Sequence, residues 1–349
     1  MLYWLGATLE QFYGPFRLLT SYLFLGGLGL VSGWLLTMWL LPKLTFLTPR
    51  DRGRAFAVDA KAAQGKPTGT GVIFISIFLG IQLIVLPFHF EALGVALMTF
   101  VAMLTGYFDD KSDNPWSEYT KGALDLVLSL VTAAILCGFS SYEIWLPLTK
   151  MTLDVPPLIF IPLASVLIWF AINATNCTDG VDGLSGTLSV IALASLGVMM
   201  FSILGHKDVS AHLLLPHYQD GAVWGIMAFS MVGCVVGYLW YNAHPSQMMM
   251  GDAGSRALGF LIGVFVIMTG NPFIIFIVSG VLLINGGTGL IKLALLRFLK
   301  VAIFKTVRFP LHDHVRHNLK WSNTQVLVRF SILQGMLTLI LIVVLIKIR

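Results

Sequence analysis

Residues 18–41 read LLTSYLFLGGLGLVSGWLLTMWLL and contain no charged side chain. A helix needs about 20 apolar residues to cross the hydrocarbon core of a bilayer, so this stretch is long enough for one crossing. Further apolar runs follow at residues 71–86, 92–108, 122–139, 158–176, 184–204, 222–241, 257–269, 273–299 and 326–346. The pattern predicts an all-α polytopic integral membrane protein with ten transmembrane helices.

The composition supports the same fold class. Of the 349 residues, 57% are hydrophobic and 11% are charged, and the mean hydropathy is +0.84. A soluble domain carries about a quarter charged residues. No hydrophilic stretch is long enough to fold a soluble domain, so we expect one polytopic membrane domain over residues 1–349.

The basic residues predict the orientation of this domain. The odd-numbered connections between the ten runs hold 16 Lys and Arg residues, whereas the other loops and the two tails hold five. Cytoplasmic loops of membrane proteins carry the excess of Lys and Arg. We therefore expect the odd-numbered connections in the cytoplasm and both termini outside. Orientation in a bilayer explains the net charge of +5, and nucleic acid is not an expected partner.

The ninth run contains a glycine cluster, NGGTG at residues 285–289, ahead of Lys292, Arg297 and Lys300. Glycine clusters are sites of helix kinks, which predicts that this helix is broken or bent and that its second half turns toward the cytoplasmic interface. The alternative is close helix packing through small residues.

Carboxylates gather at the predicted cytoplasmic ends of the runs, at Asp109, Asp110, Asp179, Asp182 and Asp252. Carboxylates from three connections would repel one another unless a cation lay among them. Mg²⁺ binds one or two carboxylates together with water and phosphate oxygens. The alternative is that these acids only end the spans at the level of the lipid headgroups. Acids and histidines of the outer loops are scattered singly along the sequence, and we interpret them as solvated loop residues: His89, Glu91, Glu143, His206, Asp208, His212 and His217.

Glycine-rich segments accompany the acids, DGVDG at residues 179–183 and GDAGS at residues 251–255. Each precedes an apolar run, and glycine at a helix N-terminus lets backbone N–H groups approach a phosphate. Lys66 and Lys121, beside cytoplasmic ends, could hold a polyanion or serve only as determinants of topology. His312 and His314 are too few for a zinc site, which favours a polar contact to substrate. These residues predict a cytoplasmic face that binds a phosphate-rich ligand through Mg²⁺.

Several short motifs together resemble those of the polyprenyl-phosphate N-acetylhexosamine-1-phosphate transferases. They occur in the family's order between about residues 43 and 330: KPT at 66–68, DDK at 109–111, TKG at 120–122, NATNCTDGVDGL at 173–184, NAHP at 242–245, MGDAGS at 250–255, PLH at 310–312 and VRF at 328–330. The resemblance implies a Mg²⁺-dependent enzyme of the bacterial inner membrane that moves a phospho-sugar from a cytoplasmic UDP-linked amino sugar to undecaprenyl phosphate and releases UMP. It leaves homodimerisation open.

The resemblance also implies roles for individual residues. Asp252 matches the Mg²⁺ ligand, and Asp109 and Asp110 match paired catalytic acids, of which the first is the expected base toward the lipid phosphate. His312 matches a further catalytic position. The residues that match substrate-binding positions are Lys66, Lys121, Asn173, Asn176, Asp179, Asp182, Asn242, Gly251 and His314. Direct attack by the lipid phosphate and a covalent intermediate on a carboxylate both stay open.

Some positions depart from the family pattern. Three consecutive histidines are expected where the chain has His312-Asp313-His314, an aromatic residue is expected at Met249, and a neutral polar residue at Lys292. The KPT and VRF motifs favour the branch that uses a UDP-N-acetylmuramoyl-pentapeptide donor, which would yield lipid I for peptidoglycan synthesis. The alternative donor is UDP-N-acetylglucosamine. A transporter would place its ionisable residues near the bilayer midplane, and a structural or receptor protein would need no acid clusters.

Overall fold

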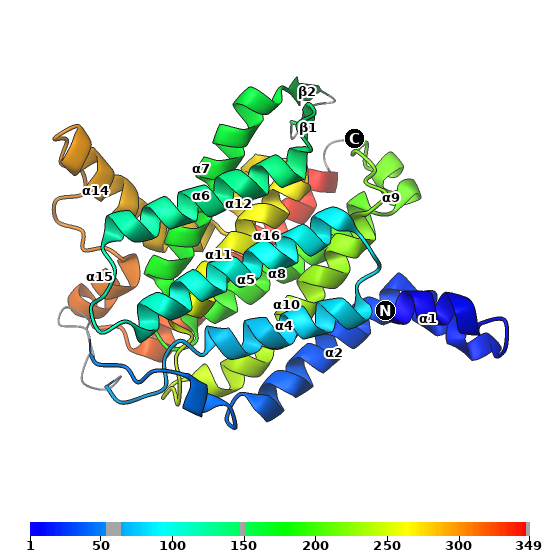
Figure 1. Cartoon of the computed structure of the whole chain (residues 1–349). Helices are drawn as coiled ribbons and strands as arrows, with labels where there is room; N and C mark the ends of the chain where they lie inside the picture. The colour runs from blue at the N-terminus through cyan, green and yellow to red at the C-terminus, as the bar shows by residue number, and fades with distance from the viewer. Residues whose placement is uncertain (54–63, 147–148, 150, 347–349) are drawn as a thin grey trace.

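The chain folds into a bundle of long helices whose connecting segments lie at its two ends (Figure 1). The computed structural model describes residues 1–53, 64–146, 149 and 151–346. Within this part, nine helical segments are long and apolar enough to cross a membrane: α2 (Tyr22–Leu40), α5 (Phe90–Lys111), α6 (Glu118–Cys137), α7 (Pro157–Thr178), α8 with its π-helical continuation (Leu184–Leu204), α10 (Gly221–Asn242), α11 (Gly251–Met268), the segment Gly280–Phe298, and α16 (Asn323–Ile346), whose qualifying part is Asn323–Val343. The all-α polytopic fold class is thereby confirmed.

The remaining predicted run, residues 71–86, forms a shorter helix, α4 (Gly71–Val85), of 15 residues. The small elements are α1 (Leu2–Leu9), α9 (Lys207–His212), α15 (Leu311–Asn318) and one antiparallel hairpin of β1 (Tyr142–Trp145) and β2 (Thr152–Val155). The hairpin was not predicted, because its short sequence lacks a long alternating pattern.

The bundle is built around α11. Of the apolar stretch of α11 that is long enough to cross a membrane, 94% is buried inside the protein. The corresponding share is 22% for α16 and 28% for α2. Helix α11 packs mainly on α7 and α5, and α2 covers α10. Small residues permit this close packing: a Cβ on Gly106 of α5 would collide with the backbone of Asp252, and one on Gly71 with that of Gly254. The start of α11 is therefore held directly against the end of α5 and the start of α4.

The predicted limits of α11 need a correction. The apolar run suggested that the span begins at residue 257 and that the MGDAGS motif lies in the connection before it. Instead, α11 begins at Gly251, so Asp252 lies in its first turn. The polar motif is buried by its neighbours, and hydropathy alone could not assign it to the helix.

The helix predicted from the ninth apolar run, residues 273–299, is interrupted twice. A π-helical turn, η5 (Leu283–Gly287), occurs at the predicted glycine cluster, and α14 (Thr288–Phe298) then extends away from the bundle with no buried residue (Figure 1). A second break at Ser279 separates α12 (Ile275–Val278) from α13 (Gly280–Leu282). There the Gln334 side chain of α16 accepts the Val281 N–H and donates to the Ile277 and Val278 carbonyls. Insertion of a side chain into the helical ladder is a known cause of such breaks.

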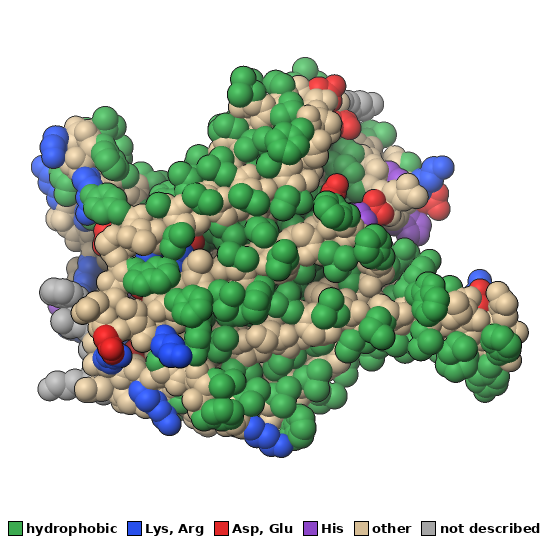
Figure 2. Space-filling model, viewed as in Figure 1, with side chains coloured by type: hydrophobic (Ala, Val, Ile, Leu, Met, Phe, Trp, Pro, Cys, Tyr) green, Lys and Arg blue, Asp and Glu red, His purple; other side chains and the backbone are tan. Residues whose placement is uncertain are grey.

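The surface agrees with a membrane environment. Figure 2 shows hydrophobic side chains along the flank of the bundle, with Lys and Arg gathered toward the end that carries α14 and α15. Large apolar side chains are exposed along the outer helices, for example Trp39 at 59%, Leu163 at 64% and Met336 at 60%. Exposed apolar surface on this scale is typical of contact with lipid.

Candidate active site

The helix ends that carry the predicted residues meet at one end of the bundle, beside α15 (Figure 1). Helices α5 and α7 end there, and α6 and α11 begin there. Ser117 caps the N-terminus of α6: its hydroxyl accepts the Thr120 N–H at 3.1 Å, and Lys121 follows in the first turn. Residues more than 100 positions apart in the sequence thus share one site.

Four of the predicted residues, Asp109, Lys121, Asn176 and Asp252, form what we call the central cluster. The Lys121 ammonium lies between two carboxylates, bonded to Asp109 Oδ2 and 3.0 Å from Asp252 Oδ2. Asn176 Nδ2 donates to the other oxygen, Asp252 Oδ1, at 3.0 Å. Both carboxylates are buried, at 7% and 6% exposure, while the Lys121 side chain is 27% exposed. The cluster is a shielded site in which two negative charges share one cation.

Asp110 occupies a supporting position beside this cluster. Its Oδ1 accepts the Asp252 N–H at 3.1 Å and its Oδ2 accepts the Ala253 N–H at 3.0 Å, so Asp110 caps the N-terminus of α11. Gly251 has φ +65, and a Cβ there would collide with Asp110 Oδ2 and lie 2.6 Å from the Gly69 nitrogen. Only glycine fits this turn, and the turn orients Asp252.

A second group, the lateral cluster, consists of Lys66, Asp182, His244 and Ser246. Asp182 Oδ2 lies 2.8 Å from His244 Nδ1 and accepts the Ser246 N–H at 3.1 Å, while Lys66 Nζ donates to Ser246 Oγ at 3.2 Å. Burial would raise the pKa of Asp182, but the hydrogen bonds from Ser246 and His244 and the charge of Lys66 outweigh it and lower that pKa. The carboxylate of Asp182 is therefore ionised at neutral pH.

Asn242 joins the two loops that form the lateral cluster. Its Oδ1 accepts the Gly183 N–H and its Nδ2 donates to the Met248 carbonyl, both at 2.8 Å. The side chain is 5% exposed and both of its polar atoms are occupied. Asn242 therefore holds the two loops together, and its polar atoms do not face a ligand.

His312 lies buried at the N-terminus of α15. Its backbone N–H donates to Asn285 Oδ1 at 2.8 Å, its Nδ1 is 3.1 Å from Asn285 Nδ2, and a Cβ on Gly180 would come within 2.5 Å of its Nε2. Burial, and then the charge of Arg316, lower the pKa of His312 to about 3. The imidazole is therefore neutral at physiological pH.

Three further predicted residues, Asn173, His314 and Asp179, also lie outside these two clusters. Asn173 is on α7 but bonds to the Trp169 carbonyl at 2.9 Å, one turn deeper than Asn176. His314 Nδ1 accepts the Arg308 N–H at 3.3 Å and so stabilises a local turn. Asp179 is the C-terminal cap residue of α7 and is half-buried.

Sequence reasoning missed Asp125, Arg256 and Asn285. Asp125 and Arg256 form an ion pair in the interior, and Asn285 fixes His312. The signal for Asp125 was present, because a charged residue inside an apolar span is a candidate functional residue by default. Arg256 precedes the predicted run at 257–269 and enters a helix only because α11 begins at Gly251. Asn285 was noted only as part of the glycine cluster, and nothing local indicates its partner.

The donor set of the central cluster fits Mg²⁺. Among the described residues, no group of three or more His, Cys, Asp or Glu side chains is arranged to hold a metal ion. Mg²⁺ requires fewer, since it binds one or two carboxylates and completes its shell with water and substrate phosphate. Asp252 and Asp109 already flank one cation, the Lys121 ammonium. Asp252 is the residue that would hold a metal with a bound phosphate, with Asp109 beside it.

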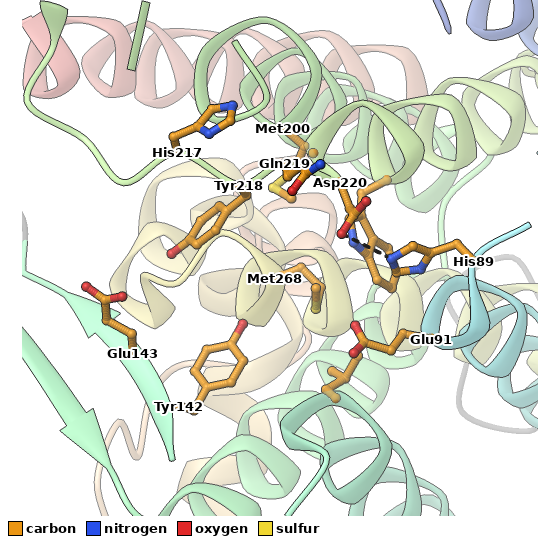
Figure 3. A pocket seen from close by; sticks show the side chains of 13 residues that line it. His89, Glu91, Tyr142, Glu143, Met200, His217, Tyr218, Gln219, Asp220 and Met268 are labelled. Atoms are coloured by element: carbon orange, nitrogen blue, oxygen red, sulfur yellow. Dashed lines mark ion pairs between the residues drawn. The ribbon is translucent and has the colours of Figure 1, made fainter. Parts of the chain in front are cut away.

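A cavity of about 280 Å³ lies at the opposite end of the bundle. Figure 3 shows His89, Glu91, Glu143, His217 and Asp220 around it, with His89 Nε2 3.4 Å from Asp220 Oδ2. The helix ends thus bring His89, Glu91, Glu143 and His217 around one cavity although they are scattered along the sequence, and Glu143 and His217 are exposed there, as expected of solvated residues. None of the predicted site residues lines this cavity.

Comparisons with known proteins agree with the motifs. The sequence model of glycosyl transferase family 4 matches residues 92–270. The chain is 51% identical over 345 residues to a phospho-N-acetylmuramoyl-pentapeptide-transferase of Treponema pallidum (strain Nichols), covering 98% of this chain and 95% of that protein. It is 28% identical over 311 residues to the protein of the same name from Wolinella succinogenes, and 26% over 304 residues to that from Sulfurimonas denitrificans. The chain therefore belongs to glycosyl transferase family 4 and, within it, to the phospho-N-acetylmuramoyl-pentapeptide-transferases.

Proposed function

We propose that this protein transfers phospho-N-acetylmuramoyl-pentapeptide from its UDP-linked donor to undecaprenyl phosphate, giving lipid I and UMP for peptidoglycan synthesis. The observation that carries the proposal is the 51% identity, over almost the full length of both chains, to a relative of that name. In the reaction, a P–O bond forms between the lipid phosphate and the β-phosphorus of the donor. The bond from that phosphorus to the bridging oxygen breaks, and UMP leaves with the electron pair.

The central cluster supplies the charges that this transfer requires. Phosphoryl transfer depends mainly on positioning and on neutralisation of charge. Mg²⁺, held by Asp252 with Asp109 beside it, would neutralise the diphosphate. Lys121 is partly exposed and bonded to both carboxylates, so its ammonium group can pair with a phosphate that binds between them. Asp109 would accept a proton from the lipid phosphate, and Asp110 holds the start of α11 in position.

The lateral cluster and His312 suit the nucleotide side of the substrate. Lys66 supplies a positive charge, and Asp182 is an ionised acceptor next to the His244 imidazole. Neutral His312 offers a hydrogen bond without adding a charge beside the loop at Gly180. Asn242 keeps the two loops together, which positions these groups relative to one another.

The proposed topology has ten crossings, both termini outside and the active site in the cytoplasm of a bacterial cell, at the inner membrane. Helix α4 is the tenth crossing, since it packs beside α2, α10, α5 and α11 although it is short. The excess of Lys and Arg at the active-site end supports the cytoplasmic assignment. The single domain and the homodimer remain predictions.

The test is release of UMP by the purified full-length protein in detergent with undecaprenyl phosphate. UDP-N-acetylmuramoyl-pentapeptide and UDP-N-acetylglucosamine are compared side by side, each with Mg²⁺ and with Mg²⁺ chelated. We expect UMP and a lipid-linked product from the first donor, only with the metal. Transfer from UDP-N-acetylglucosamine alone would overturn the donor assignment, and full activity without divalent metal would overturn the role of Mg²⁺.

A further inference from the structure

Two ion pairs connect α6 and α11, one directly below the other. Lys121 and Asp125 are four residues apart on α6, and Asp252 and Arg256 are four apart on α11, so each pair shares a helix face. We call Lys121–Asp252 the outer rung and Asp125–Arg256 the inner rung. In the inner rung, Arg256 Nε and Nη2 donate to Asp125 Oδ1 at 3.2 Å and 2.5 Å. The sign of the charge alternates along each helix.

The rungs account for much of the direct connection between the two helices. Helix α11 packs chiefly on α7 and α5, and α6 packs chiefly on α7, while α6 and α11 touch each other little. Arg256 Nη2 also lies 3.5 Å from the Lys121 carbonyl oxygen, which links the inner rung to the backbone that carries the outer one. Asn173 supports the inner rung from α7, with Nδ2 3.5 Å from Asp125 Oδ2.

The two rungs differ in how easily they can open. The Lys121 side chain is 27% exposed and is shared with Asp109, whereas both side chains of the inner rung are 2% exposed. When the outer rung opens, Lys121 can bind a phosphate and Asp252 can bind the metal in place of each other. Opening the inner rung would leave a buried charge unpaired, which is strongly unfavourable. Only the outer rung can therefore open during turnover.

We propose that Asp125 and Arg256 are positioning residues, which keep α6 and α11 in register while the outer rung opens for the donor and its metal. This inference rests on the proposed function, because it assumes that Lys121 and Asp252 exchange partners when substrate binds. Neither residue touches the substrate, since each is enclosed one helical turn deeper than the central cluster. Without the inner rung, Asp252 and Lys121 would no longer be held at the spacing that the metal and the diphosphate require.

The test measures kcat and the half-saturating concentrations of Mg²⁺ and donor in UMP release, alongside thermal stability. The main variant replaces both partners, Asp125→Leu with Arg256→Leu, because removal of a whole buried pair is often tolerated where removal of one partner is not. We expect this double variant to fold, and both half-saturating concentrations to rise at least tenfold. Arg256→Lys keeps the charge but loses the two-point contact, and we expect a rise of at least threefold.

Gln334→Leu is the matched control, because Gln334 is a fully buried polar side chain that belongs to neither cluster and bonds to α12 and α13. It should lower thermal stability and leave the Mg²⁺ dependence unchanged, as any purely structural loss would. A folded double variant with wild-type half-saturating concentrations overturns the inference. If the double variant does not fold, wild-type values in Arg256→Lys overturn it instead. An inactive wild-type protein would count against the proposed function, which this comparison of active variants does not test.

Discussion

Replacing Asp252 by Asn tests the central cluster most directly. Asp252 is 6% exposed, and its two oxygens contact Lys121 Nζ and Asn176 Nδ2, each at 3.0 Å. The amide keeps the shape of the side chain and removes one negative charge. Lys121 retains Asp109 as a partner, and Asp110 still caps α11, so we expect the variant to fold.

The expected loss follows from the geometry. Two unit charges 3.0 Å apart attract by about 5.5 kcal/mol at an effective dielectric constant of about 20, before the cost of desolvation. A divalent cation bound to Asp252 would feel at least a comparable attraction. If half of this is realised in the transition state, the barrier rises by about 2.7 kcal/mol and the rate falls about a hundredfold. We therefore expect Asp252→Asn to lose at least a hundredfold in the rate of UMP release.

The assay follows UMP release over a range of Mg²⁺ concentrations. Asp252→Asn should recover part of its rate at high Mg²⁺, because a weakened metal site can be filled by mass action. Asp109→Asn should be similarly slow but without recovery, since it removes the proposed base. Asp208→Asn, at an exposed position of α9, is the control and should behave as wild type. Near-normal transfer by both central variants would refute the reasoning.

Further predictions concern Gly251, His312 and the C-terminus. Gly251→Ala should lower both thermal stability and UMP release, because its Cβ would collide with the Asp110 carboxylate. Gly335 has open space around it, so Gly335→Ala should change neither. Equal melting temperatures for the two variants would contradict this prediction. His312 has a pKa of about 3, so it stays neutral from pH 5 to 8. The variant His312→Asn should therefore keep the shape of the pH–rate profile of UMP release. Loss of an inflection near pH 6.5 in this variant would show that His312 titrates there. The same low pKa means that the unfolded state binds the extra proton first, so stability should fall as the pH drops below about 6.5, less so in the variant. A C-terminal reporter that is active only in the cytoplasm should remain silent, and a signal from it would reverse the proposed orientation.

The clustering of the site was predictable in part. Motif order and the positions of the acids at span ends indicated that Asp109, Asp252 and Asn176 share one face of the membrane. In the structure Asn176 bonds to Asp252, and Lys121 joins Asp252 to Asp109. Helix geometry requires two neighbouring acids to face different ways, but the sequence does not indicate which of them binds Lys121. Asp109 and Asp110 are adjacent in sequence, yet one binds Lys121 and the other caps α11, because consecutive helical residues point about 100° apart.

The sequence by itself determined the membrane class, the apolar spans and the glycine cluster where the ninth helix is interrupted. These properties depend on composition and on local runs, since a sufficiently long apolar helix is stable across a bilayer wherever it occurs along the chain. Only the tertiary structure decided which charges meet. Asp125 and Arg256 are separated by 131 positions, and Gln334 reaches a helix break 53 residues away. Such partners depend on which helix faces pack together, and a single sequence holds no local record of that packing.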